Sequence, residues 1–239
     1  MAETEAIALR ATAYGESDWI VTLLGAHGGK IRGIARGARK SRKRFGAGFD
    51  PGTRGTLSFR VQPRSELATI EGFGNARPPA LGPDPVAGFA VVNVAVECCD
   101  AVSVEDEDAA RRFTLLSELL ARVADGASPA VTLAWFLAAL LADAGFAPRF
   151  DRCVRCERPV GNRARFDAAR VALVCASCTG EAPVASVSAE IAARIAALTP
   201  ASRDVEAART TVDLLGAAVE HLVGRPLKSL EFLRSTPLG

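Results

Sequence analysis

This 239-residue chain lacks the residues and patterns on which several common catalytic functions depend. It contains only two histidines, His27 in an expected turn and His221 in an expected helix, and neither has an evident acid–base partner. The phosphate-binding pattern Gly-x-x-x-x-Gly-Lys-Ser/Thr is missing, which excludes a nucleotide-driven motor of that type. We therefore expect this chain not to be an enzyme.

Export and membrane-spanning patterns are also missing. The chain opens Met-Ala-Glu-Thr-Glu, which is acidic rather than basic, and no uninterrupted apolar stretch follows it. The longest apolar run, residues 130–142, is too short to cross a bilayer and predicts a buried helix. We therefore expect a cytoplasmic protein with no membrane partner, in which cysteines bind metal rather than form disulfides.

Positive charge is concentrated in the first third of the chain. Residues 1–80 carry thirteen Lys or Arg and seven Asp or Glu, whereas residues 81–239 carry sixteen and twenty. Such an asymmetry indicates that the first part meets a polyanion.

Alternating apolar and polar residues predict five strands in the first 75 or so residues. Leu57, Phe59 and Val61 should point inward, and His27-Gly28-Gly29 should form a tight turn. Five short strands with one longer connection at 37–55 are typical of a Greek-key barrel of the OB type. The expected strands cover residues 6–14, 18–25, 30–36, 56–61 and 67–73.

Proline and glycine at residues 75–85 break regular structure, so we expect an OB-fold domain at 1–77 and a helical domain at 78–239. Gly224 and Pro226 should end the last predicted helix. The expected fold class is α+β multidomain, with a zinc module inserted at about 150–181. Helices are predicted over residues 86–104, 108–125, 130–144 and 203–223.

Two Cys-x-x-Cys pairs predict a metal site. Cys153 and Cys156 precede Cys175 and Cys178, and residues 165–167 and 171–174 should form a short hairpin between the pairs. Each pair directs two thiolates at one ion, so together they complete a tetrahedral shell for one structural Zn²⁺. Redox chemistry would need only one pair. Cys98 and Cys99 are expected to be small buried residues of an apolar helix.

Residues 30–44, here called the basic segment, contain eight cations and no anion. Because like charges repel, this density favours a phosphate-bearing ligand over a merely solvated surface, although a ribosomal or membrane-surface patch would share the pattern. OB folds bind nucleic acid through such a strand face and its loops. The predicted nucleic-acid-binding residues are Lys30, Arg32, Arg36, Arg39, Lys40, Arg42, Lys43 and Arg44, with Arg54, Arg60 and Arg64 as a possible extension.

Other candidates carry weaker predictions. Tyr14, Trp19, Phe45 and Phe49 are potential stacking partners for bases, or core residues. The acidic run at residues 105–108 is compatible with a metal-dependent nuclease, but carboxylates before a helix also favour its positive end.

Taken together, these motifs resemble the RecO family of bacterial recombination mediators. The resemblance rests on Tyr14-Gly-Glu-Ser-Asp-Trp-Ile-Val-Thr-Leu-Leu, on the sequence from His27 to Ser41, on Arg44-Phe45-Gly46 and on Phe49-Asp-Pro-Gly. It resumes at the four cysteines and at Arg225-Pro-Leu-Lys-Ser-Leu-Glu-Phe-Leu, and therefore covers essentially the whole chain.

The resemblance implies a nucleoid-associated protein that binds single- and double-stranded DNA, anneals complementary strands and contacts the single-strand-binding protein. With RecR, it would help load the RecA recombinase. It also implies DNA contact at the basic segment and zinc ligation at the four cysteines, which are not universal in the family. An RNA-binding or ribosome-associated zinc protein, and an adaptor without a direct DNA role, are the alternatives.

Overall fold

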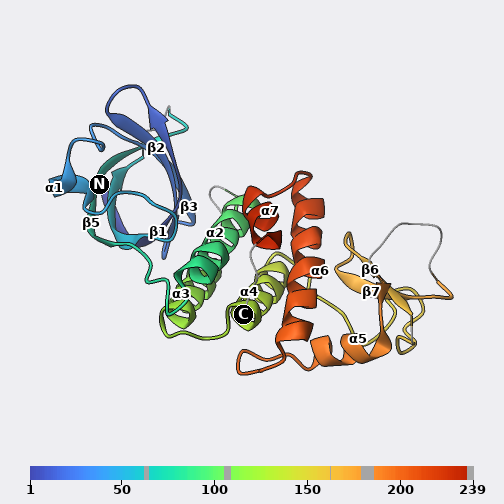
Figure 1. The fold of residues 1–239 in the computed structure, drawn as a ribbon. Coiled ribbons are helices and arrows are strands. Elements are labelled where there is room, and N and C mark those ends of the chain that lie inside the picture. Colours follow the sequence, from blue (N-terminus) through green and yellow to red (C-terminus); the bar gives the residue numbers. More distant parts are fainter. Residues whose placement is uncertain (62–64, 105–108, 162, 179–185, 236–239) are drawn as a thin grey trace. The chain divides into compact units, whose positions relative to one another are not determined.

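The computed structural model describes residues 1–61, 65–104, 109–161, 163–178 and 186–235. The chain forms two compact units, Met1–Ala124 and Asp125–Gly239 (Figure 1). The last barrel strand ends at Arg77, so regular structure extends into the first residues of the predicted boundary at 75–85. The compact units instead divide about forty residues later, because two helices pack with the strands.

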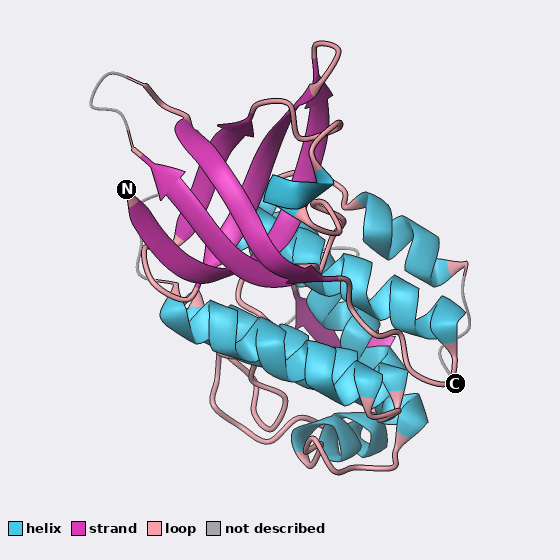
Figure 2. Ribbon diagram, turned by 90° about the vertical axis from the view of Figure 1, so that its left-hand side faces the viewer, coloured by secondary structure: helices cyan, strands magenta, loops and turns pink. Residues whose placement is uncertain are grey.

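Five strands form a closed barrel in the order β1-β2-β3-β5-β4, which is the arrangement expected of an OB fold. All neighbours are antiparallel except β3 and β5, which pair in parallel through Gly33 with Ala68 and Ile34 with Thr69. Figure 2 shows these strands in magenta. Their bounds are β1 Ala2–Tyr14, β2 Asp18–Gly25, β3 Lys30–Ala35, β4 Arg54–Arg60 and β5 Ala68–Arg77.

The barrel core consists of the alternating apolar residues that the pattern places inward, among them Leu23, Leu57 and Phe73. Gly33 is required where β3 meets β5, because a Cβ atom there would lie 2.7 Å from the carbonyl oxygen of Ala68. The prediction for Val61 is wrong. Its side chain is 68% exposed, since β4 ends at Arg60 and Val61 no longer follows the alternation of the strand.

Two helices pack with the barrel: α2, Pro85–Val102, against β1, and α3, Ala110–Ala124, against β2. Asp84 caps α2 by accepting the N–H groups of Val86 and Ala87, and Pro85 occupies the first turn. By length and composition α2 could span a membrane, but 61% of it is buried within the structure, as in a core helix.

The second unit combines helices with a small sheet. Helix α4, Pro129–Asp143, packs against α6, Val205–Val223, and α5, Ala189–Ala196, packs against the same helix. Strands β6, Ala164–Asp167, and β7, Ala172–Cys175, form the predicted hairpin, which β8, Ser186–Val187, extends. As predicted, α6 ends at Gly224, whose φ is +68°. The short helices α5 and α7, Lys228–Arg234, were not predicted.

Candidate nucleic-acid interface and metal centre

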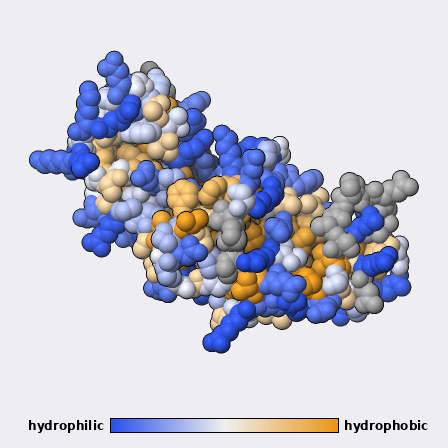
Figure 3. All heavy atoms as spheres, in the orientation of Figure 1, coloured by the Kyte–Doolittle hydropathy of each residue, from blue (hydrophilic) through white to orange (hydrophobic). Residues whose placement is uncertain are grey.

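The basic segment follows β3 into a loop that holds one turn of helix, α1, Arg42–Phe45. Phe45 anchors this turn, because its ring is buried 5.7 Å from that of Phe49, which stacks on Phe73 at 5.3 Å. Phe45 and Phe49 therefore belong to the core and cannot stack on bases. The three cations that precede Phe45 in α1 are exposed, and Figure 3 shows hydrophilic residues projecting where α1 lies.

The turn between β1 and β2 holds the loop in place. The Asp18 carboxylate accepts the N–H of Gly37 at 2.8 Å, and the carbonyl of Ser17 accepts the N–H of Arg39 at 3.0 Å. The Gly37 N–H, followed by the Ser17 hydroxyl, lowers the pKa of Asp18. Arg44 closes the loop by donating to the carbonyl of Arg36 at 2.8 Å. Nothing in the local sequence pattern assigned this role to Asp18, because its partner lies nineteen residues away.

Seven members of the basic segment, here called the exposed cations, have solvent-exposed side chains. Within the described part of the chain, no carboxylate lies within the 4.0 Å ion-pair distance of their charged groups. Their positive charge is therefore available to a ligand. The exposed cations are Arg32, Arg36, Arg39, Lys40, Arg42, Lys43 and Arg44.

Lys30, the eighth predicted contact, lies in a different environment. Its ammonium group lies 2.8 Å from a carboxylate oxygen of Asp100, and the two side chains are only 15% and 11% exposed. It also donates to the carbonyls of Asp100, at 2.7 Å, and Ser103, at 3.2 Å, at the C-terminal end of α2. Arg10 approaches the same carboxylate at 3.3 Å. Lys30 thus joins the barrel to α2.

The remaining candidates also differ in how much of each side chain is open to a ligand. Tyr14 is 54% exposed at the end of β1, where it pairs with Asp18. Trp19 is partly buried with the Arg39 guanidinium 5.8 Å from its ring centre, so the Trp19 ring adjoins the basic loop. Arg54 pairs with Glu5 at 2.6 Å, and Arg60 pairs with Glu71 at 3.0 Å, which reduces the charge that either offers. Arg64 and the acidic run at 105–108 lie outside the described residues.

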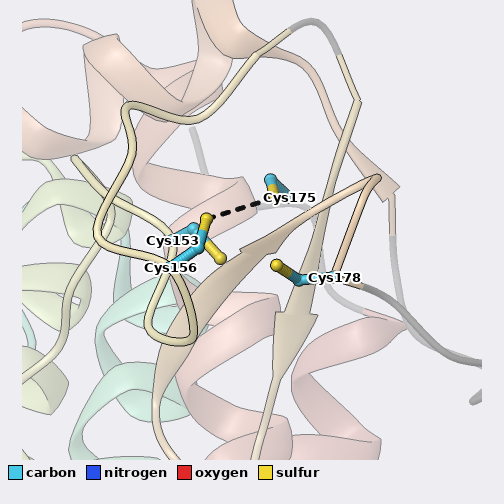
Figure 4. A group of neighbouring side chains, drawn as sticks. All are labelled: Cys153, Cys156, Cys175 and Cys178. Carbon is cyan, nitrogen blue, oxygen red and sulfur yellow. Dashed lines mark hydrogen bonds between the residues drawn. The ribbon is translucent and has the colours of Figure 1, made fainter.

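The four predicted cysteines form one cluster. Every ligand sulfur lies within 4.8 Å of the others, and the Cys156 and Cys175 sulfurs are 3.7 Å apart. Figure 4 shows the side chains of the Cys153–Cys156 loop facing Cys175, at the end of β7, and Cys178, beyond it. Sulfurs of a tetrahedral shell with metal–sulfur bonds of about 2.3 Å lie about 3.8 Å apart. The cluster therefore fits a structural metal ion.

Hydrogen bonds shift the pKa values of Cys153, Cys156 and Cys178 in different directions. Burial raises the pKa of Cys153, but backbone N–H groups, first that of Cys175, outweigh it and lower that pKa to about 6. The backbone and guanidinium of Arg158 lower the pKa of Cys156. The neighbouring thiols of Cys175 and Cys156 raise that of Cys178 to about 12. A divalent cation bound by these cysteines would stabilise all four thiolates at once and so lower the pKa of every ligand.

Cys98 and Cys99 are fully buried in α2, as predicted. His27 donates its backbone N–H to Thr4 in the turn, and His221 lies in the last turn of α6. These placements bring neither histidine to the cysteine cluster. The features together define an α+β multidomain protein, with an N-terminal OB-type barrel and a four-cysteine metal centre in its helical part.

Comparisons with known proteins assign this architecture to a family. The family model "Recombination protein O N terminal" matches residues 1–74, and "Recombination protein O C terminal" matches residues 87–231. The chain is 34% identical to DNA repair protein RecO of Myxococcus xanthus (strain DK1622), over 99% of this chain and 98% of that protein. It is 32% identical to DNA repair protein RecO of Thermobifida fusca (strain YX), over 91% and 90%. The chain therefore belongs to the RecO family of DNA repair proteins.

Proposed function

We propose that this chain is a non-catalytic recombination mediator that binds single- and double-stranded DNA and anneals complementary strands. The observation that carries the proposal is the group of seven exposed cations on an OB-type barrel, without carboxylate partners among the described residues. Phosphate contacts of this kind position a nucleic acid without reading its sequence. We therefore expect binding that depends little on sequence.

Annealing follows from charge alone. Two complementary strands repel each other along their phosphates, and a compact cationic surface that contacts both lowers that repulsion and raises their local concentration. No bond is formed or broken in the protein. The loop is already held by Asp18 and Phe45, so little conformational order has to be acquired on binding.

The partners in this proposal follow from family membership. We expect contacts with the single-strand-binding protein and with RecR, a functional link to RecA, and a cytoplasmic, nucleoid-associated location. The rival functions, an RNA-binding or ribosome-associated zinc protein and an adaptor without a direct DNA role, differ in their ligand. Affinities for DNA and RNA of equal length separate the first rival, and an absence of nucleic-acid binding would favour the second.

For the metal we propose one Zn²⁺ held by Cys153, Cys156, Cys175 and Cys178. Zinc prefers tetrahedral thiolate shells, and four protein ligands leave no position for a substrate. Its role would be to stabilise the fold of residues 153–178, because thiolate–zinc binding energy contributes to folding.

The test is a salt series of binding to fluorescent single-stranded DNA by anisotropy. Seven phosphate contacts at about 0.7 each predict a log–log slope of about −5. Replacing five of the exposed cations by alanine should reduce the slope to about −1.5. The five are Arg39, Lys40, Arg42, Lys43 and Arg44.

The matched control replaces Arg54, Arg60, Arg122, Arg170 and Arg194, five arginines that carry carboxylate partners, one at a time. Because a carboxylate already pairs with each of these arginines, every single change should leave the slope within about 0.3 of that of the unaltered protein, less than half of one contact. A slope near zero for the unaltered protein, or annealing unchanged in the five-alanine variant, would refute the proposal.

A further inference from the structure

Arginine is concentrated around the cysteine cluster. Residues 149–170 contain seven arginines and three carboxylates, a net charge of four positive. In the rest of residues 81–239, seventeen acidic residues outnumber nine basic ones. The segment between the cysteine pairs and just before them therefore stands out from an otherwise acidic part of the chain.

The three carboxylates of this segment are already occupied by arginines. Glu157 pairs with Arg149 at 2.7 Å, and Asp167 pairs with Arg170 at 2.7 Å at the far end of the β6–β7 hairpin. Asp151 lies 3.7 Å from Arg152, which is the longest of the three ion pairs. These pairs neutralise Arg149 and Arg170 more fully than Arg152.

Four arginines lie close to the two Cys-x-x-Cys turns and are here called the knuckle arginines: Arg152, Arg155, Arg158 and Arg163. Arg155 donates to the carbonyl of Cys178 at 2.6 Å, and the Arg158 guanidinium is hydrogen-bonded to Cys156. Arg152 donates to the carbonyl of Glu157 at 3.2 Å. Arg163 immediately precedes Ala164, which pairs with Cys175.

Neutralising the metal centre accounts for only part of this charge. Four thiolates around a divalent ion carry two negative charges, which two arginines offset. Arg155 and Arg158 contact the cysteines and suit that role. Arg163 is exposed and, within the described residues, has no carboxylate partner, while Arg152 pairs with Asp151 only at 3.7 Å and shares Glu157 with Arg149. The cationic surplus is therefore left for a ligand outside the module.

We propose that Arg152 and Arg163, the knuckle arginines that do not contact the cysteines, form a second contact for the phosphate backbone of single-stranded DNA, in addition to the barrel. The proposal rests on the proposed DNA-binding function. A guanidinium group matches phosphate oxygens with two parallel donors, and Arg152, held by the carbonyl of Glu157, is pre-arranged for this ligand. Two contact surfaces in separate compact units would let one molecule hold two strands, or two parts of one strand, as annealing requires.

The test compares two double variants with equal loss of charge. Arg152→Ala/Arg163→Ala removes the two knuckle arginines that do not contact cysteines. Arg170→Ala/Arg203→Ala removes two exposed arginines, one paired with Asp167 at the other end of the hairpin and one outside the module. Binding of each full-length variant to fluorescent single-stranded DNA is measured across a salt series, and bound zinc is measured to confirm that the module remains folded.

Two phosphate contacts should reduce the slope by about 1.4 and weaken binding about 25-fold at 0.1 M salt. The control variant should bind like the unaltered protein. Equal slopes for the two variants would overturn the proposal, as would a loss that the control shares. If the two double variants have equal salt slopes but the five-alanine variant of the barrel still shows its expected reduction in slope, the proposed function stands and only the second contact is refuted. If the unaltered protein does not bind, both fail. If Arg152→Ala/Arg163→Ala loses zinc, two single variants replace it. Arg163→Lys keeps the charge and should bind single-stranded DNA normally, whereas Arg163→Glu should bind it more weakly.

Discussion

Lys30 and Arg32 lie two residues apart on β3, yet the structure places them in different environments. Lys30 lies against Asp100 at the end of α2, whereas Arg32 is exposed. Replacing Lys30 by methionine keeps its aliphatic stem but leaves Asp100 without its shortest ion pair. Replacing Arg32 by alanine removes only an exposed charge. We expect the first change to lower stability and the second to weaken DNA binding.

The magnitude follows from burial. Removing one partner of a buried ion pair costs about 3–5 kcal/mol. Arg10 still lies 3.3 Å from Asp100 after the change, and both side chains of the pair retain a small exposed fraction. We therefore expect Lys30→Met to lower the free energy of unfolding by about 2–3 kcal/mol. Arg32→Ala should change it by less than about 0.5 kcal/mol.

Urea unfolding and the salt slope of single-stranded DNA binding, measured on both variants, separate these roles. Lys30→Met should keep the full slope, and Arg32→Ala should lose about 0.7 of it. The reasoning is refuted if Lys30→Met unfolds like the unaltered protein while losing the slope of one contact. In that case the lysine would be a DNA contact, as the charge pattern alone had predicted.

Three further outcomes can be checked. Tyr14→Ala should weaken binding to single-stranded DNA about 5-fold or more through lost stacking, whereas Tyr14→Phe should not, and equal affinities for all three proteins would exclude Tyr14 from the interface. Metal analysis should find about one zinc per chain, and chelation should remove hydrogen-exchange protection from residues 153–178; unchanged protection would contradict a structural metal. The pKa of Asp204 is lowered to about 2, first by Arg194 and then by the N–H of Ala207, so its stabilisation is complete above pH 4 and is lost as pH falls toward 2. Asp204→Asn should reduce the dependence of the free energy of unfolding on pH over that range. A pH dependence identical to that of the unaltered protein would contradict this.

The barrel was predictable because strand periodicity is local. The inward-facing apolar residues of each strand can be recognised within that strand. The His27–Gly29 turn and the long connection at 37–55 separated consecutive strands along the chain. The helix α1 was not predicted, because four residues with three consecutive cations have no helical period, and Phe45 alone anchors them. Val61 was misassigned because alternation does not show where a strand ends.

The metal site and the basic segment differed in how far sequence could resolve them. Cysteine spacing fixes the geometry of each Cys-x-x-Cys turn, so the cluster was predicted correctly from its ligands. The basic segment was predicted as one surface of eight cations. Alternation placed Lys30 opposite Ile31 but could not show that α2 covers that end of β3, since Asp100 lies seventy residues away. A charge count along the chain therefore overestimates the exposed surface.

Placement in separate compact units makes the barrel cations and the knuckle arginines experimentally separable. Arg32 and Arg163 belong to different compact units, so a double-mutant cycle between Arg32→Ala and Arg163→Ala, compared with and without DNA, measures their coupling through DNA. If a single strand contacts both surfaces at once, losing either contact reduces the effective concentration of the other, and the cycle is non-additive on long strands. On strands too short to reach both surfaces, the same cycle becomes additive. The cycle changes from additive to non-additive at a certain strand length. That length is the amount of single-stranded DNA that one molecule contacts.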